Sequence, residues 1–269
     1  MAEPMNNLSG KEWLQYSFSI WRDIRKNGEE TQVKHPAMFP SQLAERLMRI
    51  YTRKDGEVVL DPFMGTGSTL VAAYKLKRKG IGVELNPEYV TLCKKRLSNI
   101  TGSFYAGLIR PDIFVGDSRE ILKKIDSDSV DLCINSPPYW DILNQKRTAD
   151  KRNILSYSDS DIDLGNIADY DEFLAGLKKV YSEVFRVLKP NKRCCVVLMD
   201  IRKKSKFYPF HIDLTRVMTE IGLELEDFII WDRQHEYNNM KTLGYPWVFR
   251  VNKVHEFICI YLKPKKAED

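Results

Sequence analysis

The sequence predicts an α/β fold in which a mainly parallel sheet is covered by helices on both faces. From about residue 56 onward, short apolar runs alternate with amphipathic segments, and this alternation is typical of strand–helix–strand folds. The length of 269 residues suits one α/β domain with a substantial core. Hydrophobic residues make up 43% and charged residues 29%, which excludes a disordered chain.

Seven apolar segments are the predicted strands: Val58–Asp61, Ile81–Glu84, Asp112–Asp117, Ser129–Ser136, Cys194–Asp200, Glu226–Trp231 and His255–Lys263. Helices are predicted between them at Ser68–Lys79, Pro87–Asn99, Ser118–Ile125, Tyr170–Leu188 and Pro209–Ile221. Two stretches interrupt this order, a polar one at 141–168 and a basic, aromatic one at 232–252. Loops that follow the carboxyl ends of strands border the ligand crevice of such sheets, so both are candidate substrate-recognition loops.

Charge and cysteine usage narrow the classes of partner. The net charge of +5, from 42 Lys and Arg against 37 Asp and Glu, is compatible with a polyanionic partner without requiring one. The five cysteines lie mostly inside apolar runs without metal-ligand spacing, so we expect buried, reduced thiols and no metal. No run approaches the roughly 20 apolar residues that cross a bilayer, and the start lacks the apolar core of a signal peptide. We therefore expect a cytoplasmic protein without membrane partners.

The segment DPFMGTGST, Asp61–Thr69, follows a predicted strand and opens a predicted helix. Its glycines allow a tight turn close to a ligand, and the helix start offers unpaired N–H groups. It lacks both the lysine of a phosphate P-loop and the third glycine of the dinucleotide motif. Glu84 ends the next strand, where a carboxylate can accept both ribose hydroxyls, and Asp117 ends the third, where it can meet an adenine amino group. One such acid would more often be a helix cap, but three beside a glycine loop predict a nucleoside cofactor.

Four motifs together resemble the DNA amino-methyltransferases of the N4-cytosine and N6-adenine type: HPAMFP (35–40), DPFMGTGST (61–69), IGVELNPEY (81–89) and SPPYW (136–140). The resemblance runs from about residue 35 to 263. It implies a Rossmann-like methyltransferase fold with an antiparallel last strand, and S-adenosyl-L-methionine as cofactor. In one common arrangement of this family the SPPY segment precedes the cofactor loop, whereas here it follows, as a circular permutation would produce. The implied cofactor-binding residues are His35, Ala37, Phe39, Asp61, Phe63, Gly65, Gly67, Ser68, Thr69, Glu84 and Asp117.

The SPPYW segment supplies the predicted catalytic residues Ser136, Pro137, Pro138 and Tyr139. An exocyclic amine is a poor nucleophile because its lone pair is delocalised into the ring. The Ser136 hydroxyl and the Pro137 carbonyl can accept its N–H bonds, while the prolines stiffen the segment. Tyr139, together with Trp140, is predicted to stack on an extruded base. A rigid proline turn with aromatic packing is the structural alternative. C5-cytosine chemistry is disfavoured, because no cysteine follows a proline in this chain.

We expect a single methyltransferase domain over residues 1–269. Residues 1–55 form the N-terminal segment with HPAMFP, and 56–140 hold the cofactor half and catalytic motif. The loops 141–168 and 232–252 are the candidates for substrate recognition, with Trp140, Arg233 and Lys241 as the proposed substrate contacts.

DNA is the polymer that the resemblance favours. Serine at the first motif position favours N4-cytosine over N6-adenine. RNA, including ribosomal RNA, is the alternative, because little of the chain is left for a recognition domain. The basic residues Arg202, Lys203, Lys204 and Lys206 either meet phosphates or form a solvated charge run. A small-molecule or protein methyltransferase and a non-catalytic nucleic-acid-binding protein are the remaining hypotheses.

Overall fold

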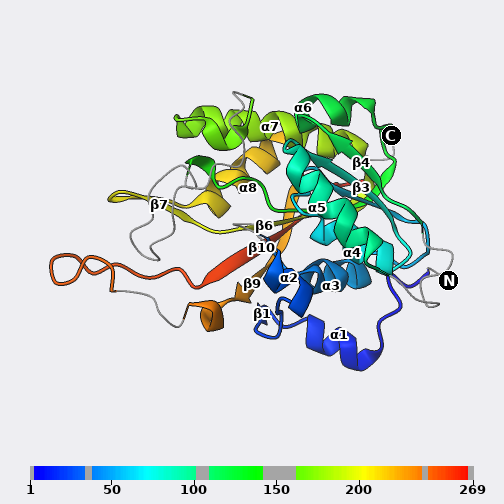
Figure 1. The fold of residues 1–269 in the computed structure, drawn as a ribbon, viewed down its shortest axis with the longest axis horizontal. Helices are drawn as coiled ribbons and strands as arrows, with labels where there is room; N and C mark the ends of the chain where they lie inside the picture. Colours follow the sequence, from blue (N-terminus) through cyan, green and yellow to red (C-terminus); the bar gives the residue numbers. More distant parts are fainter. Residues whose placement is uncertain (1–2, 34–37, 101–108, 142–161, 238–241, 266–269) are drawn as a thin grey trace.

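The computed structural model describes residues 3–33, 38–100, 109–141, 162–237 and 242–265. Its centre is an eight-stranded sheet in the order β1-β9-β10-β6-β5-β2-β3-β4 (Figure 1). The strands are β1 (Ile20–Trp21), β2 (Val58–Asp61), β3 (Lys79–Glu84), β4 (Asp112–Val115), β5 (Val130–Asn135), β6 (Leu188–Leu198), β9 (Glu224–Asp232) and β10 (His255–Leu262). Strand β10 runs antiparallel to both of its neighbours, and the other pairs are parallel.

The predicted α/β class and the antiparallel last strand are confirmed, but the predicted count of seven strands is wrong. The eighth strand, β1, comes from the N-terminal segment and pairs in parallel with β9 at the edge of the sheet. It contains only two residues, Ile20 and Trp21, which is too few to show a strand period in the sequence.

The helices are α1 (Gly10–Tyr16), α2 (Gly28–Gln32), α3 (Ser41–Tyr51), α4 (Ser68–Lys75), α5 (Pro87–Ser98), α6 (Ser118–Ile121), α7 (Tyr170–Val187) and α8 (Phe210–Ile221). Short 3₁₀ turns follow at η2 (Leu122–Lys124), η4 (Leu164–Asn166) and η5 (Gln234–Glu236). Figure 1 shows α7 and α8 on one side of the sheet and α3 on the other. Each side has its own apolar cluster, one formed with α7 and α8 and one formed with α3 and α4.

The central strands place the predicted functional motifs at one edge of the sheet. All six residues of β5 are buried, as expected for a parallel strand covered on both faces. Strand β2 pairs with β3 on one side and β5 on the other, so the carboxyl ends of β2, β3 and β5 lie at the same edge. That edge carries the glycine loop, Glu84 and the SPPYW segment.

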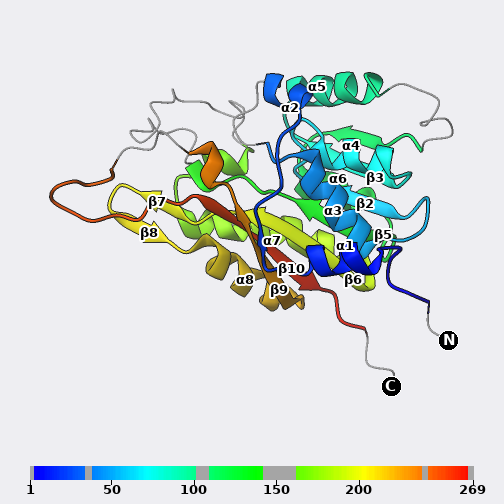
Figure 2. The same ribbon diagram turned by 90° about the horizontal axis from the view of Figure 1, so that it is seen from below.

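Two features lie outside the main layers. The basic run after β6, which the sequence analysis did not assign to strands, forms a separate hairpin of β7 (Ile201–Lys203) and β8 (Lys206–Tyr208). The hairpin and residues 242–254 project side by side from one end of the molecule (Figures 1 and 2). All five cysteines are free and buried, as predicted. In the parts of the chain that are described, no helix is long and apolar enough to span a membrane.

Candidate active site

Asp61, at the end of β2, connects the two ends of the glycine loop through hydrogen bonds. One carboxylate oxygen accepts a hydrogen bond from the Thr69 hydroxyl at 2.6 Å, and the other accepts from the Phe63 N–H at 3.0 Å. Asp61 is buried, and this burial raises the pKa of its carboxyl group to about 7. Asp61 and Thr69 therefore stabilise the conformation of the loop, and neither of them lines the cavity described below.

The two predicted glycines have different surroundings. Gly67 begins α4 with a φ of 82°, and a Cβ built there would lie 2.2 Å from Cys93 Sγ of α5. The obstacle to a side chain at Gly67 is thus helix packing and not a ligand. Gly65 does line the cavity, and its N–H donates a hydrogen bond of 2.9 Å to Glu84 Oε2.

Glu84 ends β3 and directs its carboxylate toward the glycine loop. Besides Gly65, the Asn86 N–H donates to its other oxygen at 2.8 Å. Burial raises the pKa of Glu84, and the nearby charge of Asp163 acts in the same direction.

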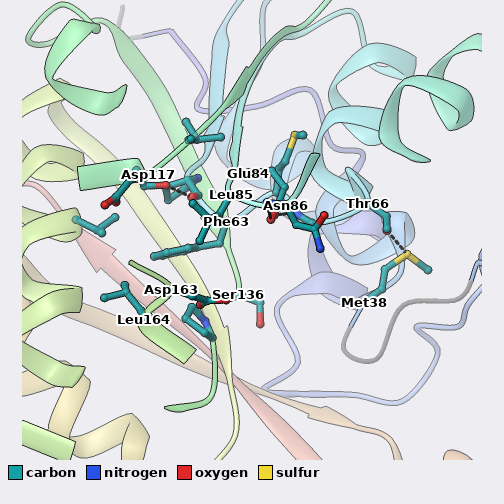
Figure 3. A pocket seen from close by; sticks show the side chains of 18 of the residues that line it. Met38, Phe63, Thr66, Glu84, Leu85, Asn86, Asp117, Ser136, Asp163 and Leu164 are labelled. Atoms are coloured by element: carbon teal, nitrogen blue, oxygen red, sulfur yellow. Dashed lines mark hydrogen bonds between the residues drawn. The ribbon is translucent and has the colours of Figure 1, made fainter. Parts of the chain in front are cut away.

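A cavity of about 870 Å³, part of it open to solvent, lies at this edge of the sheet. Figure 3 shows Asp117 toward one end, Met38 and Thr66 toward the other, and Ser136 with Asp163 between them, below Phe63 and Glu84 in this view. The lining residues are Met38, Phe39, Pro62, Phe63, Met64, Gly65, Thr66, Ser68, Val83, Glu84, Leu85, Asn86, Gly116, Asp117, Ser118, Ser136, Pro138, Ile162, Asp163, Leu164 and Val180. The predicted cofactor loop and the predicted catalytic motif thus share one cavity.

The charges of the cavity have a single sign. Glu84, Asp117 and Asp163 contribute carboxylates, and the described lining contains no Lys, Arg or His. Asp117 also caps α6 and forms an ion pair of 2.7 Å with Arg119, whose guanidinium is not among the lining groups. Such a cavity favours a ligand with hydroxyl donors and positive charge over one with phosphates.

A chain of hydrogen bonds links the SPPYW segment to β10. The Ser136 hydroxyl donates to the Tyr139 hydroxyl at 3.4 Å, and that hydroxyl donates to Glu256 of β10 at 3.1 Å. Glu256 is buried and forms an ion pair with Arg233.

Arg233, a predicted substrate contact, pairs with carboxylates inside the protein in this structure. It also bonds Glu236 at 2.5 Å, and only 16% of its side chain is exposed. Burial opposes its charge, but Glu256 and Glu236 outweigh that effect and raise the pKa of Arg233. Two carboxylates therefore hold the Arg233 guanidinium in place.

Trp140 also differs from its predicted role. Its ring is only 5% exposed, with centroids 5.1 Å from Tyr170 and 5.0 Å from Tyr208 of β8. Lys203 Nζ lies 3.6 Å from the centroid of the same ring. Trp140 is therefore enclosed in this structure, and it connects the SPPYW segment to the β7–β8 hairpin.

The sequence matches the model of a known protein family over most of its length. The model of the N6/N4 methyltransferase family, described as DNA methylase, matches residues 3–95 and 130–269. The match includes the glycine loop, the SPPYW segment and the strands β6 to β10. The chain belongs to this family. The resemblance inferred from the four motifs is thereby confirmed.

Curated relatives of this chain match over shorter stretches. Type II methyltransferase M.BglI of Bacillus subtilis is 42% identical over 95 residues, covering 34% of this chain and 26% of that protein. M2.MboI of Moraxella bovis is 42% identical over 98 residues, covering 36% and 34%. Orphan methyltransferase M.BamHII of Bacillus amyloliquefaciens is 40% identical over 86 residues, covering 30% and 32%. The matched part spans about a third or less of the length of these relatives.

One solved structure of low identity shares the fold, and a second is similar over only part of both chains. An S-adenosylmethionine-dependent methyltransferase of Methanosarcina mazei is 13% identical, with a TM-score of 0.50 over 79% of this chain and 95% of that chain. A Thermus thermophilus protein crystallised with S-adenosyl-L-methionine is 28% identical, with a TM-score of 0.40 over 58% and 54%.

S-adenosyl-L-methionine is the methyl donor of the DNA methylase family, and the cavity suits it. Its ribose hydroxyls can donate to the carboxylate of Glu84, and its sulfonium and ammonium charges are attracted by the acidic lining. No phosphate has to be accommodated.

Of the predicted site residues, eight line the cavity: Phe39, Phe63, Gly65, Ser68, Glu84, Asp117, Ser136 and Pro138. His35, Ala37 and Lys241 lie outside the described residues. The sequence analysis missed Met38, whose sulfur accepts from the Thr66 hydroxyl at 2.9 Å, although it stands between two predicted residues.

Asp163 is a second lining residue that was not predicted for this cavity. This residue belongs to the stretch 141–168, which was predicted to contact substrate. It caps η4 by accepting from the Gly165 N–H at 2.8 Å, and it lines the cavity near Glu84. An acid followed by Leu-Gly in a polar loop gave no specific signal for this place.

A buried ion pair holds the N-terminal segment against the glycine loop. Arg96 of α5 bonds Glu30 of α2 at 3.1 Å and donates to the Thr66 carbonyl at 2.8 Å. Glu30 in turn accepts from the Ser41 N–H at 2.7 Å. The pair joins residues 66 positions apart, so sequence spacing gave no indication of it.

Proposed function

We propose that the protein is an S-adenosyl-L-methionine-dependent DNA methyltransferase that modifies the exocyclic amino group of a base, N4 of cytosine in preference to N6 of adenine. One observation carries the proposal: Ser136 and Pro138 line the same cavity as Gly65 and Glu84. An amine acceptor and a nucleoside-binding carboxylate are thus within one space. We further propose that residues 1–269 work as a single methyltransferase domain, because one sheet runs from β1 at one edge to β4 at the other and contains strands from both ends of the chain.

The polarity of the hydrogen-bonded chain supports the role of Ser136. Because Glu256 accepts from Tyr139, the tyrosine oxygen is free to accept from Ser136. The serine proton is then directed away from the substrate, and the lone pairs of its oxygen can accept an amine N–H. The Pro137 carbonyl is the second acceptor.

These two acceptors favour a pyramidal amine with its lone pair on nitrogen. S-adenosyl-L-methionine supplies an electrophilic methyl group when it is bound. The lining carboxylate of Glu84 binds and orients the donor, and the rigid Pro137–Pro138 pair fixes the acceptors relative to it. Tyr139 is the proposed stacking partner of the extruded base, with its ring positioned edge-on to Phe210 at 6.4 Å.

Serine at the first position of the motif supports the choice of cytosine, since N6-adenine enzymes of the resembling family usually carry Asp or Asn there. The family description and the type II methyltransferases among the relatives support DNA as the polymer. The type II methyltransferases among the relatives are compatible with a restriction enzyme partner for this protein. M.BamHII, an orphan methyltransferase, is equally compatible with a protein that has no such partner.

The test is methyl transfer from labelled S-adenosyl-L-methionine to DNA and RNA from a host that lacks the gene. Nuclease digestion and mass spectrometry then identify polymer and base together. We expect N4-methylcytosine in DNA. N6-methyladenine in DNA would replace the base assignment, and label in RNA alone would replace the polymer. Cofactor binding without any transfer would indicate a non-catalytic binding protein.

A further inference from the structure

Two segments form a projection at one end of the molecule, the hairpin (residues 201–208) and the arm (residues 242–254). Figures 1 and 2 show them side by side, extending away from the sheet. They touch each other: Arg250 donates to the Lys204 carbonyl at 3.4 Å, and Lys253 Nζ lies 4.8 Å from the Phe207 ring centroid. The projection is thus a composite of two parts of the chain that are 34 or more residues apart in sequence (242 − 208 = 34).

Three aromatic side chains of the arm are almost fully exposed to solvent. Tyr245 is 80% exposed, Trp247 89% and Phe249 93%, and Phe207 of the hairpin is 38% exposed. Scattered single apolar residues are normal on a surface, but a cluster of large rings marks an interaction site.

The charge of the projection identifies the kind of partner. Its basic residues are Arg202, Lys203, Lys204, Lys206, Arg250 and Lys253, and neither segment contains an Asp or Glu. The chain as a whole nearly balances 42 basic against 37 acidic residues, so this segregation is local. Basic and aromatic groups together suit a polyanion with flat rings, and two copies of the same surface would repel each other.

The projection is also anchored at the catalytic segment. Tyr208 of the hairpin packs against Trp140 with ring centroids 5.0 Å apart. Lys203 forms an ion pair of 2.6 Å with Asp141, the residue after SPPYW. The hairpin therefore begins next to the proposed base-binding position.

We propose that the hairpin and arm form the surface that holds duplex DNA beside the extruded base. Lys204, Lys206 and the arginines contact the phosphates, Lys203 anchors the hairpin, and the arm rings contact or insert between exposed bases. This inference rests on the proposed function for its choice of DNA, and it assigns the contact to residues that the candidate active site does not include.

The first experiment removes the arm rings with the double change Trp247→Ala and Phe249→Ala. The matched control is Trp13→Ala with Phe18→Ala, an exposed aromatic pair on and beside α1. Binding of a fluorescently labelled DNA duplex of mixed sequence is followed by anisotropy, and cofactor binding by calorimetry. We expect the arm variant to bind the duplex about tenfold more weakly or worse, with cofactor affinity unchanged, and the control to bind normally.

The second experiment removes hairpin charge with Lys204→Ala and Lys206→Ala. The control is Lys178→Ala with Lys179→Ala, an exposed basic pair on α7. If each hairpin lysine neutralises a phosphate, the slope of log affinity against log salt should fall by up to about two, with little change in the control.

The outcomes separate this inference from the proposed function. If both variants bind the duplex with parental affinity and salt slope while the parent methylates DNA, the surface is assigned wrongly. The same holds if the arm variant only converts a dimer to a monomer in sedimentation. If the parent methylates nothing but its duplex binding depends on Trp247, Phe249, Lys204 and Lys206, the proposed function fails and the surface stands.

Discussion

At the scale of single residues, chemistry near the cavity depends on partners that come from distant parts of the chain. Tyr139 is oriented by Glu256, 117 positions later, and Glu256 is paired with Arg233. Asp61 is instead held by near neighbours, because its two hydrogen bonds connect the start of the glycine loop to its end. In each case burial makes a polar contact matter more than it would in water.

Asp61 should make the stability of the protein depend on pH. Its pKa is raised from 3.8 to about 7 by burial, so its contribution is fully present below about pH 4 and is lost as pH rises through about 7. Asp61→Asn removes this titration and keeps the size of the side chain. The parent should therefore lose a few kcal/mol relative to the variant between about pH 4 and pH 8. Urea unfolding at a series of pH values measures this, and a difference that does not change with pH would contradict it.

Tyr139→Phe removes the hydroxyl group and keeps the aromatic ring, so it measures the contribution of the hydroxyl alone. The ring can still stack, but Ser136 loses the acceptor that directs its proton away from the substrate. One net hydrogen bond contributes about 0.5–1.5 kcal/mol, so kcat for methyl transfer should fall about twofold to tenfold. Affinity for S-adenosyl-L-methionine should stay unchanged in calorimetry.

Two further variants complete that series. Ser136→Ala should also slow transfer, with some activity retained through the Pro137 carbonyl. Tyr139→Ala should raise the free-energy barrier to methyl transfer by about 1–3 kcal/mol more than Tyr139→Phe does, because stacking on the base is lost. Transfer at the parental rate in Tyr139→Ala would show that SPPYW is not the catalytic segment.

At the scale of elements, the glycine loop is held by helices on either side. Gly67 packs against α5 with no room for a side chain, and Arg96 of α5 holds both the loop carbonyl of Thr66 and Glu30 of α2. The N-terminal segment therefore reaches the cavity because α5 binds it, and Met38 and Phe39 enter the lining as a consequence.

Glu30→Gln tests this arrangement. The change leaves the buried Arg96 without its close anionic partner, and breaking a buried pair costs up to about 3–5 kcal/mol of unfolding free energy. Glu29→Gln is the control, because Glu29 is 43% exposed and 3.6 Å from Arg96, so its loss should cost about 1 kcal/mol or less. Urea unfolding compares the two. The Glu30 variant should also bind the cofactor more weakly, and equal effects of the two changes would contradict the role of the Arg96–Glu30 pair in holding the N-terminal segment.

At the scale of the whole molecule, the cavity exists only in the assembled fold. Its lining comes from residues between Met38 and Val180, carried by the N-terminal segment, the carboxyl ends of the four strands β2, β3, β4 and β5, the start of η4, and α7. A ligand that needs all of these parts binds the folded state and not the unfolded chain. Binding and global stability are therefore linked.

S-adenosyl-L-methionine should raise the melting temperature, and NAD should not. At a hundredfold excess over Kd a ligand adds about 2.7 kcal/mol, which is several degrees for a chain of this size. NAD carries phosphates into a lining of three carboxylates without a basic side chain, and we expect no shift. Differential scanning fluorimetry measures both. Equal stabilisation by NAD would contradict the assignment of the cavity.

The sequence by itself determined the α/β class, the positions of most strands and helices, and the motifs whose residues meet in the cavity. The predicted helix Tyr170–Leu188 and the observed α7, Tyr170–Val187, differ by one residue. Such features follow from local periodicity, capping and glycine content, which need no knowledge of distant contacts.

Only the tertiary structure decided which polar and aromatic groups are available. Trp140 and Arg233 resemble substrate contacts in the sequence, but the fold encloses the first and pairs the second with Glu256 and Glu236. Asp163 resembles a loop residue and lines the cavity. The physical reason is that burial and partner choice depend on which distant segments the sheet brings together, and a sequence pattern records only the residue's own neighbours.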